Sequence, residues 1–288
     1  MTQTAEQQYL QDFNNRKDQS WEVEYPSIGL KLHCLLNTDE DRIRENILTN
    51  LKRGHEQIWA YPEQETEVCI CAGGPSLKKH FNEIKNIQKK GGKVIALANT
   101  AHILVNAGII PNAHVLLDAK PRNKTFIQDI KTTYFIASQC DPEVFDEAEK
   151  TENKIYIWHG VNNDEEFQVI HELGDPWIPV QGGSTLTLRA IRLFNILGYK
   201  NFHIFGFDSC YEGDEHHAYE QPDADKHKKL KLEFEGRDFT VSPWMLAQFM
   251  EFQKFVQNFG MKINMKVYGN GLIEHLIRKG GGKVNIEE

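Results

Sequence analysis

The sequence predicts an α/β protein, Rossmann-like, with a mostly parallel sheet flanked by helices. From Glu67 onward, short β-rich runs alternate with amphipathic helical windows, which is the pattern of successive βαβ units. Two of these units are well marked, because each combines an apolar run with a one-sided apolar helix that ends at a glycine. Glycine and polar residues follow several predicted strands, where open α/β sheets bind their ligands.

The chain of 288 residues is long enough for one large α/β domain with an appendage. Residues 1–64 are polar, and we expect an N-terminal helical appendage with two helical stretches. The second stretch opens at Thr38–Asp41, where acidic side chains suit a helix N-terminus. Residues 65–288 then form the Rossmann-like nucleotide-binding catalytic domain, with a lid insertion at about 209–241.

Composition excludes several classes of protein. Hydrophobic residues make up 40% of the chain and charged residues 26%, and no apolar run approaches the roughly 20 residues that a membrane helix needs. The start Met1–Glu6 lacks a basic and apolar signal, so we expect a cytoplasmic protein without a membrane span. The net charge of −8 disfavours broad binding of nucleic acid. The chain has five cysteines and no Cys-x-x-Cys pair, so packing of Cys69 and Cys71 on one face of a strand is favoured over a metal or redox site.

The individual elements follow from periodicity. The helix after the first strand keeps Leu77, Phe81 and Ile84 near one face and ends at Gly91–Gly92. A second helix begins near Ser184, and a closing core helix covers Pro243–Phe259. The segment 211–239 shows little periodicity and is predicted as a long loop or lid. The predicted strands are Val68–Cys71, Lys93–Ala98, His114–Leu117, Tyr134–Ala137, Lys154–Ile157, Asn201–Phe205 and Lys262–Val267.

The turn after the first core strand is the first candidate site. Gly73 and Gly74 let a backbone approach a ligand closely, and Ser76 after Pro75 is placed to cap a helix whose free N–H groups favour phosphate. The turn is neither a Walker A loop nor a G-x-G-x-x-G fingerprint, because no Lys-Ser/Thr pair or third glycine follows. A plain strand-to-helix turn is the structural alternative.

Two more candidate positions follow the next strands. Asn99 could bond a base or sugar, and Thr100 could do so or cap the next helix. Asp118 ends an apolar strand, with Lys120 and Arg122 close behind. Its carboxylate could hold Mg²⁺ or a ribose hydroxyl while the cations meet phosphates, or it could form a surface ion pair.

A second glycine-rich helix start lies later in the chain. Gly182, Gly183, Ser184 and Thr185 open a helix suited to a phosphate or carboxylate, so that two helix starts could face one anion. Asp208 ends the following strand and is a candidate catalytic residue, because a buried carboxylate there needs a partner such as a backbone N–H, a ligand hydroxyl or a metal.

The lid supplies the candidate catalytic groups. His216 and His217 could act as a general base toward an acceptor hydroxyl, contact a ligand, or remain solvated polar residues. Tyr211 or Tyr219 could stabilise a leaving phosphate. A zinc site is disfavoured, because the two histidines lack a spaced third ligand.

With these motifs in view, residues 67 to about 280 resemble the 6-hydroxymethylpterin diphosphokinase MptE-like family, which includes motility-associated glycosylation factors and many phage-encoded members. The resemblance rests on Ala72–Leu77, Val94–Asn99 and Gly206–Asp208, and the segment Asn270–Ile273 resembles the family's C-terminal portion. The same order of motifs is similar to the bacterial sialyltransferases of glycosyltransferase family 42. A phage or bacterial context fits this resemblance.

The resemblance implies roles for particular residues. In the sialyltransferases, a Gly-Pro-Ser-Leu turn, an Asn after the second strand and a Ser/Thr-Gly helix start hold CMP-sialic acid, so Gly74–Ser76, Asn99 and Gly183–Ser184 would contact the nucleotide. Those enzymes also carry a histidine shortly before the last long helix. This chain has Thr240–Pro243 there, so a base would come from His216 or His217.

Three functions follow as hypotheses. The leading one is a transferase that uses a nucleotide-activated donor, most like a glycosyltransferase with a nucleotide-sugar donor. The second is a diphosphokinase that transfers diphosphate from ATP to a pterin-like alcohol, with Mg²⁺ held by Asp118 and Asp208. The third is a non-catalytic nucleotide-binding protein. The acceptor and the oligomeric state stay open, a homo-oligomer included.

Overall fold

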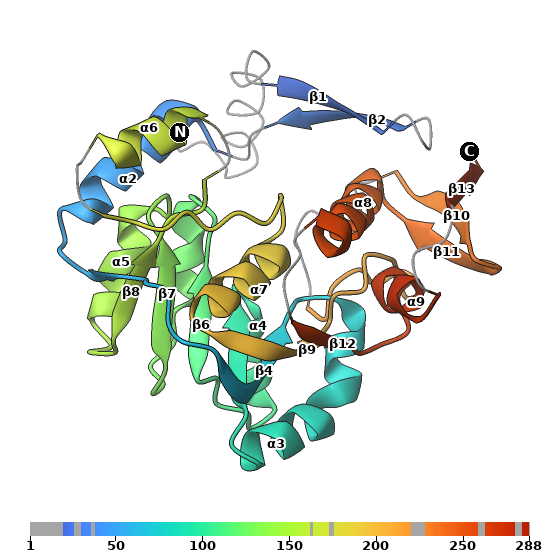
Figure 1. Ribbon diagram of the computed structural model, residues 1–288, viewed down its shortest axis with the longest axis horizontal. Helices are drawn as coiled ribbons and strands as arrows, with labels where there is room; N and C mark the ends of the chain where they lie inside the picture. The colour runs from blue at the N-terminus through green and yellow to red at the C-terminus, as the bar shows by residue number, and fades with distance from the viewer. Residues whose placement is uncertain are drawn as a thin grey trace, which may run out of the picture.

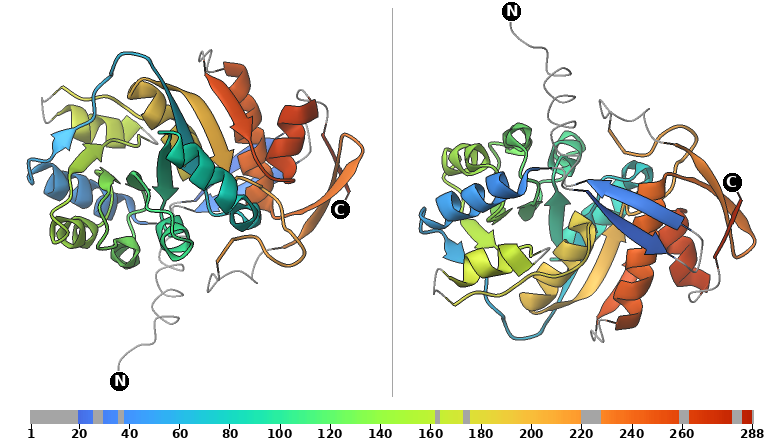
Figure 2. Two further views of the ribbon diagram at one scale, coloured as in Figure 1. Left: turned by 90° about the horizontal axis from the view of Figure 1, so that it is seen from below. Right: turned by 90° about the horizontal axis from the view of Figure 1, so that it is seen from above.

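The computed structural model describes residues 20–25, 30–35, 38–161, 164–172, 176–219, 228–258, 263–279 and 284–287. Its centre is an eight-stranded sheet in the order β12-β9-β4-β5-β6-β7-β8-β3, and every neighbouring pair is parallel. Figure 1 shows this sheet through the middle of the molecule, and Figure 2 shows helices on both sides of it. The predicted α/β class and parallel sheet are confirmed.

The sheet strands and their helices alternate along most of the chain. The strands are β3 (Glu56–Gln57), β4 (Gln64–Cys71), β5 (Lys93–Leu97), β6 (Ala113–Leu116), β7 (Thr133–Ala137), β8 (Ile155–Trp158), β9 (Tyr199–Phe205) and β12 (Asn264–Val267). The helices are α2 (Glu40–Leu51), the 3-10 helix η3 (Pro75–His80), α3 (Phe81–Lys89), α4 (Thr100–Asn106), the 3-10 helix η4 (Pro121–Phe126), α5 (Pro142–Glu149), α6 (Asp164–His171), α7 (Leu186–Ile196), α8 (Pro243–Asn258) and α9 (Leu272–Lys279). All seven strands predicted from the sequence are present.

Alternation along the buried strands builds two core layers. Cys69 and Cys71 of β4 pack with Leu77 and Ile84 in one hydrophobic cluster, on the face covered by η3 and α3. Val68 and Ile70 point to the opposite face, into the larger cluster that contains α7 and α8. Both cysteines are therefore core residues, and burial raises the pKa of the Cys69 thiol to about 12.

The helix boundaries have local causes. Asp39 caps α2 by accepting from the backbone N–H groups of Asp41 and Arg42. Gly91, with φ +99°, ends α3, and the N–H of Gly92 returns to the carbonyl of Ile87 at 3.0 Å. Ser242 accepts from the N–H of Met245, so α8 begins at Pro243 as expected.

Outside the main sheet, two predictions need correction. Residues expected to be helical in the appendage form the antiparallel hairpin of β1 (Ser20–Tyr25) and β2 (Leu30–Leu35), whereas residues 1–19 lie outside the described part. The second half of the predicted lid is a hairpin of β10 (Leu230–Phe234) and β11 (Arg237–Val241), which β13 (Val284–Glu287) extends on the β10 side. The alternating pattern of Leu230, Leu232 and Phe234 was the missed signal.

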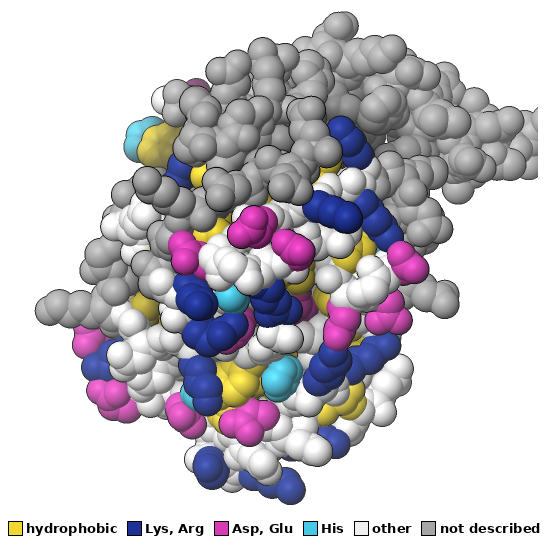
Figure 3. Space-filling view, turned by 90° about the vertical axis from the view of Figure 1, so that its right-hand side faces the viewer, with side chains coloured by type: hydrophobic (Ala, Val, Ile, Leu, Met, Phe, Trp, Pro, Cys, Tyr) yellow, Lys and Arg dark blue, Asp and Glu magenta, His cyan; other side chains and the backbone are white. Residues whose placement is uncertain are grey.

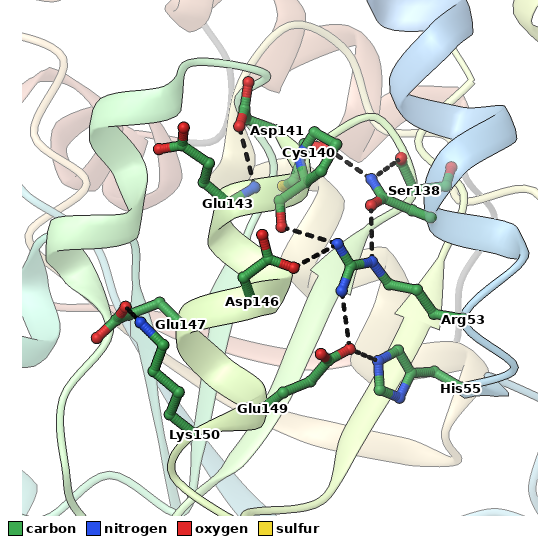
Figure 4. A network of polar contacts seen from close by, with 12 residues as sticks. Arg53, His55, Ser138, Cys140, Asp141, Glu143, Asp146, Glu147, Glu149 and Lys150 are labelled. Atoms are coloured by element: carbon green, nitrogen blue, oxygen red, sulfur yellow. Dashed lines mark hydrogen bonds and ion pairs between the residues drawn. The ribbon is translucent and has the colours of Figure 1, made fainter.

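The segment before β4 is tied to the sheet by a polar network (Figure 4). Arg53 donates to the carboxylates of Asp146 and Glu149 at 2.6 and 3.0 Å, and His55 shares Glu149 at 2.8 Å. Asn50 of α2 donates to the carbonyls of Ser138 and Cys140, just after β7. The segment from α2 to His55 therefore packs onto α5 and the loop after β7, and the boundary near residue 64 stays a prediction.

Candidate functional site

The candidate site lies where the strand order reverses. From β4 the chain runs through β5, β6, β7 and β8 on one side, and then returns to place β9 on the other side of β4. Ligands of open α/β sheets bind beyond the carboxyl ends of the strands at such a reversal. The loops that follow β4 and β9 are Ala72–Gly74 and Gly206–Tyr211, and they contact each other directly.

The first glycine turn is closed by the protein's own groups. Gly74 N–H donates to the carbonyl of Gly206 at 2.7 Å, and Ser76 N–H donates to the Asp208 carboxylate at 3.0 Å. A Cβ on Gly74 would lie 2.4 Å from Asp208 Oδ2 and 2.5 Å from the Gly206 carbonyl oxygen. A glycine is therefore required at position 74 by packing within the protein, whether or not a ligand binds there.

Asp208 is the centre of this packing. It is 5% exposed, and both Gly269 and Gly271 lie against it, so that a Cβ on Gly271 would come within 2.6 Å of its Cα. Burial raises the pKa of the Asp208 carboxyl, while the Ser76 N–H favours the charged form and limits that rise. Its carbonyl accepts the N–H of Leu272 at 2.8 Å and so holds the start of α9.

Ser76 and Thr100 do not cap helices as predicted. Gly74 is the N-cap of η3, and Ser76 lies inside that helix. Its hydroxyl is buried, and within the described part of the chain it has no hydrogen-bond partner of ordinary geometry. Thr100 is 1% exposed, and its hydroxyl accepts from Leu97 N–H and donates to the Cys71 carbonyl. Thr100 therefore joins the ends of β4 and β5, and its predicted ligand contact remains a prediction.

Two further predicted site residues reach solvent, Asn99 in part and Asp118 fully. Asn99 is half-buried at the N-cap of α4 and makes no capping hydrogen bond through its side chain. The residue before it, Ala98, has φ +46°, and His114 bonds its carbonyl at 2.7 Å. Asp118 is exposed after β6, two strands away from β4. Its role toward Mg²⁺ or ribose stays a prediction.

The lid segment lies over the first turn. Ala218 N–H donates to the Gly73 carbonyl at 2.8 Å, and Lys79 of η3 forms an ion pair with Glu212. A Cβ on Gly73 would meet the Tyr219 hydroxyl at 3.0 Å and His217 Cδ2 at 3.3 Å. The first glycine turn is thus covered by lid side chains.

The two predicted histidines stand together in this lid. The His216 and His217 rings are 4.4 Å apart, and the His216 ring lies 5.5 Å from that of Tyr211. Burial, with His216 beside it, lowers the pKa of His217 to about 4, so His217 is neutral at pH 7. Its Nδ1 is buried and has no hydrogen-bond partner among the described residues. Glu220 and His227 of the same predicted lid lie outside the described residues.

The second glycine turn is more open. Gly182 and Gly183 adopt φ +153° and +81°, and Thr185 caps α7 by accepting from Leu188 N–H at 3.2 Å. Ser184 is exposed, and both its N–H and its hydroxyl donate to the Glu251 carboxylate of α8, at 3.0 and 2.8 Å. The predicted anion-binding groups of Ser184 are therefore occupied by a carboxylate of the same chain, that of Glu251.

Each helix start thus has its own internal carboxylate, Asp208 or Glu251, and the expectation that the two starts face one anion stays a prediction. The sequence reasoning missed Glu251 and also Arg189, which is 3% exposed and donates to the Gly183 and Val180 carbonyls. Glu251 is the only carboxylate in α8, and Arg189 interrupts an apolar helix face. Each helix has one other charged residue, Lys254 in α8 and Arg192 in α7, so a charged side chain on a largely apolar helix was the available signal.

Further properties of the described residues concern surface charge, possible metal ligands and membrane-spanning helices. On the side of the molecule shown in Figure 3, basic and acidic side chains are interspersed, with several Lys and Arg grouped near the centre. Across the residues with described positions, no group of three or more His, Cys, Asp or Glu could hold a metal ion. No helix in that same part of the chain is long and apolar enough to cross a membrane.

The fold and site together define a Rossmann-like α/β protein with two glycine-rich helix starts at the carboxyl edge of its sheet. The chain belongs to the 6-hydroxymethylpterin diphosphokinase MptE-like family, whose model matches residues 41–214, more than half of the 288. No curated protein matches the chain.

Among solved structures, the chain is similar to the MAf glycosyltransferase from Magnetospirillum magneticum AMB-1. The TM-score is 0.62 at 18% sequence identity, and the match covers 81% of this chain and 37% of that one. At this identity the likeness shows the shared fold. The chain corresponds to little more than a third of the glycosyltransferase's length, so the activity of that whole protein does not transfer with the fold.

Proposed function

We propose that the chain is a transferase that uses a nucleotide-activated donor, most like a glycosyltransferase with a nucleotide-sugar donor. The observation that carries the proposal is the solvated set of donors at the start of α7, where Ser184 N–H and Oγ already bind a carboxylate. The family match and the fold shared with a glycosyltransferase support a transferase.

In this proposal the donor's phosphate binds at Ser184 and Thr185. Helix N-termini favour phosphate through free N–H groups and the helix dipole, and the same groups stabilise the charge that develops on the leaving phosphate. The nucleoside extends toward the reversal of strand order between β4 and β9. Asn99 is the residue predicted to bond its base or sugar. Gly73–Ser76 shape this edge, with Asp208 fixing their backbone.

The acceptor's proton goes to a lid histidine. His216 is half-buried rather than enclosed and is the better-placed candidate for the base. His217 is neutral at pH 7 and can accept a proton, but a pKa of about 4 makes it a weak base. Asp208 was also predicted as catalytic, and its burial and its bond to Ser76 N–H favour a structural role instead.

The proposal is tested in two stages. Thermal-shift measurements with CMP, UDP, GDP, AMP and ATP, each with and without Mg²⁺, identify the nucleotide, because a bound ligand stabilises the native state by mass action. Incubation with the corresponding nucleotide sugars should then release nucleoside mono- or diphosphate. Absence of any stabilisation and any release across the panel would overturn the proposal.

The family description favours one alternative, Mg²⁺-dependent diphosphate transfer from ATP to a pterin-like alcohol. Mg²⁺ commonly uses one or two carboxylates together with substrate phosphates, so the exposed Asp118 could serve without a larger cluster. Activity with ATP that is abolished by EDTA and by Asp118→Asn would select this alternative. Binding without product, unchanged by replacing His216 and His217, would indicate a non-catalytic nucleotide-binding protein.

A further inference from the structure

Glu251 lies on the donor groups that the proposed function assigns to a phosphate. One oxygen, Oε2, accepts from both the N–H and the hydroxyl of Ser184. A Cβ on Gly183 would approach this same oxygen to 2.9 Å, so the glycine makes room for the carboxylate. The contact joins α8 to the loop before α7 across 67 positions of sequence.

The loop that carries these donors is also held by contacts that do not involve Glu251. The buried guanidinium of Arg189 donates to the carbonyls of Gly183 and Val180 at 2.9 and 3.0 Å. Thr185 caps the helix through its own hydroxyl. Because these contacts position the Ser184 donors, removal of the Glu251 side chain should leave the site formed, and the nearby positive guanidinium favours an anion there.

A phosphate and the Glu251 carboxylate cannot share the Ser184 donors. Two like charges on the same donors repel each other, and the repulsion is stronger at a protein surface than in bulk water because the effective dielectric is lower. Ser184 is exposed and Glu251 is only half-buried, so the carboxylate can leave by rotation of its own side chain.

We propose that Glu251 is an internal competitor for the donor's phosphate, which closes the α7 site in the free protein and must swing away before an anionic ligand binds. This inference rests on the proposed function. Its consequence is that the free protein binds anions more weakly than its donor groups allow, because part of the binding free energy displaces the carboxylate.

The test is calorimetric titration of the full-length protein with inorganic pyrophosphate and with the nucleotide that gives the largest thermal shift. Glu251→Ala should tighten both by about five- to tenfold, the scale of one charge-assisted hydrogen bond at an exposed position. Glu251→Gln should lie between Glu251→Ala and the wild type, because an amide oxygen still accepts but carries no charge. Ser184→Ala should weaken binding.

The matched control is Glu147→Gln, which removes another carboxylate, paired with Lys150 on the exposed face of α5. It should leave both affinities unchanged. If the wild type binds but Glu251→Ala binds equally or more weakly, the competitor role is wrong and the proposed function stands. If neither protein binds any nucleotide of the panel, the proposed function fails and the inference fails with it.

Discussion

The two glycine-rich helix starts look alike in sequence and differ in the protein. Both turns follow the sheet's carboxyl edge, and both place a serine N–H on a carboxylate of the same chain. At the first turn the carboxylate is Asp208, 5% exposed and enclosed by glycines. At the second it is Glu251, which reaches an exposed serine from a separate helix.

This difference separates a structural contact from an exchangeable one. The Asp208 carboxylate accepts from Ser76 N–H and its backbone carbonyl holds the start of α9, so replacing the side chain would leave the Ser76 N–H without this acceptor. Glu251 has a solvated alternative, and its partners can bond to water or to a ligand. Of two motifs suited to an anion, the more open one is therefore the better candidate for a ligand site.

The largest expected effect comes from Gly74→Ala. The new Cβ would lie 2.5 Å from a backbone oxygen that cannot move freely, so we expect a loss of about 3–5 kcal/mol in the free energy of unfolding. Gly73→Ala should cost less, because its neighbours are the ends of the Tyr219 and His217 side chains. Urea unfolding measures both. Equal losses for the two variants would contradict a rigid first turn.

The next test compares the two carboxylates directly. Asp208→Ala should lower the free energy of unfolding by about 2–4 kcal/mol, because the Ser76 N–H is left buried without an acceptor. Glu251→Ala should lower it by no more than about 0.5 kcal/mol, since its contact is exposed. If Glu251→Ala proved the more destabilising variant, the assignment of the two contacts would be reversed.

Acid should weaken the protein through its buried histidines. Burial lowers the pKa of His114, His159 and His217 to about 4, against 6.5 as the ordinary value. Between pH 6.5 and 4 the unfolded chain binds more protons, so stability falls as pH falls through this window. The raised pKa of Asp208 acts in the opposite sense, since its contribution is lost as pH rises.

Between pH 7 and pH 5 each fully buried histidine should contribute a loss of about 1–2 kcal/mol. His114→Gln, which keeps an N–H donor for the Ala98 carbonyl, should reduce the pH dependence by that amount. Urea unfolding at the two pH values measures this difference. The same pH dependence in the variant would show that His114 does not titrate in this way.

The smallest effects belong to the second turn. Thr185→Ala removes the cap of α7 and should cost about 1 kcal/mol of stability. Ser184→Ala should change stability by less than about 0.5 kcal/mol, although it removes a donor from the proposed phosphate site. Thermal unfolding of the two variants should therefore rank them opposite to their effects on pyrophosphate binding. A large loss of stability in Ser184→Ala would assign it a structural role.

The sequence predicted the parts of the fold that depend on local patterns. The seven sheet strands follow from short apolar runs, and the ends of α3 and α8 follow from Gly91 and Pro243. The short hairpin β10–β11 was missed, because its polar surroundings resemble a loop over so few residues. Its three alternating apolar positions were too short a signal beside the charged segment before them.

The sequence predicted where the candidate site lies, but not which side chains contact each other there. Glycines and serines after the strands marked both helix starts, because these residue types suit close approach and N–H donation. The partners Asp208–Ser76 and Glu251–Ser184 join residues 132 and 67 positions apart, which no local spacing encodes. Tertiary packing therefore decides which helix start is enclosed by the protein and which one stays open to solvent.

The most direct test of the central claim is an amide NMR titration of the isotopically labelled protein with inorganic pyrophosphate, followed by the nucleotide selected by thermal shift. The Ser184 and Gly183 amides should shift saturably, whereas the Ser76 amide, bonded to buried Asp208, should stay in place or move only slightly. A saturable shift at Ser76 with none at Ser184 would contradict the account, because the closed turn would then be the ligand site.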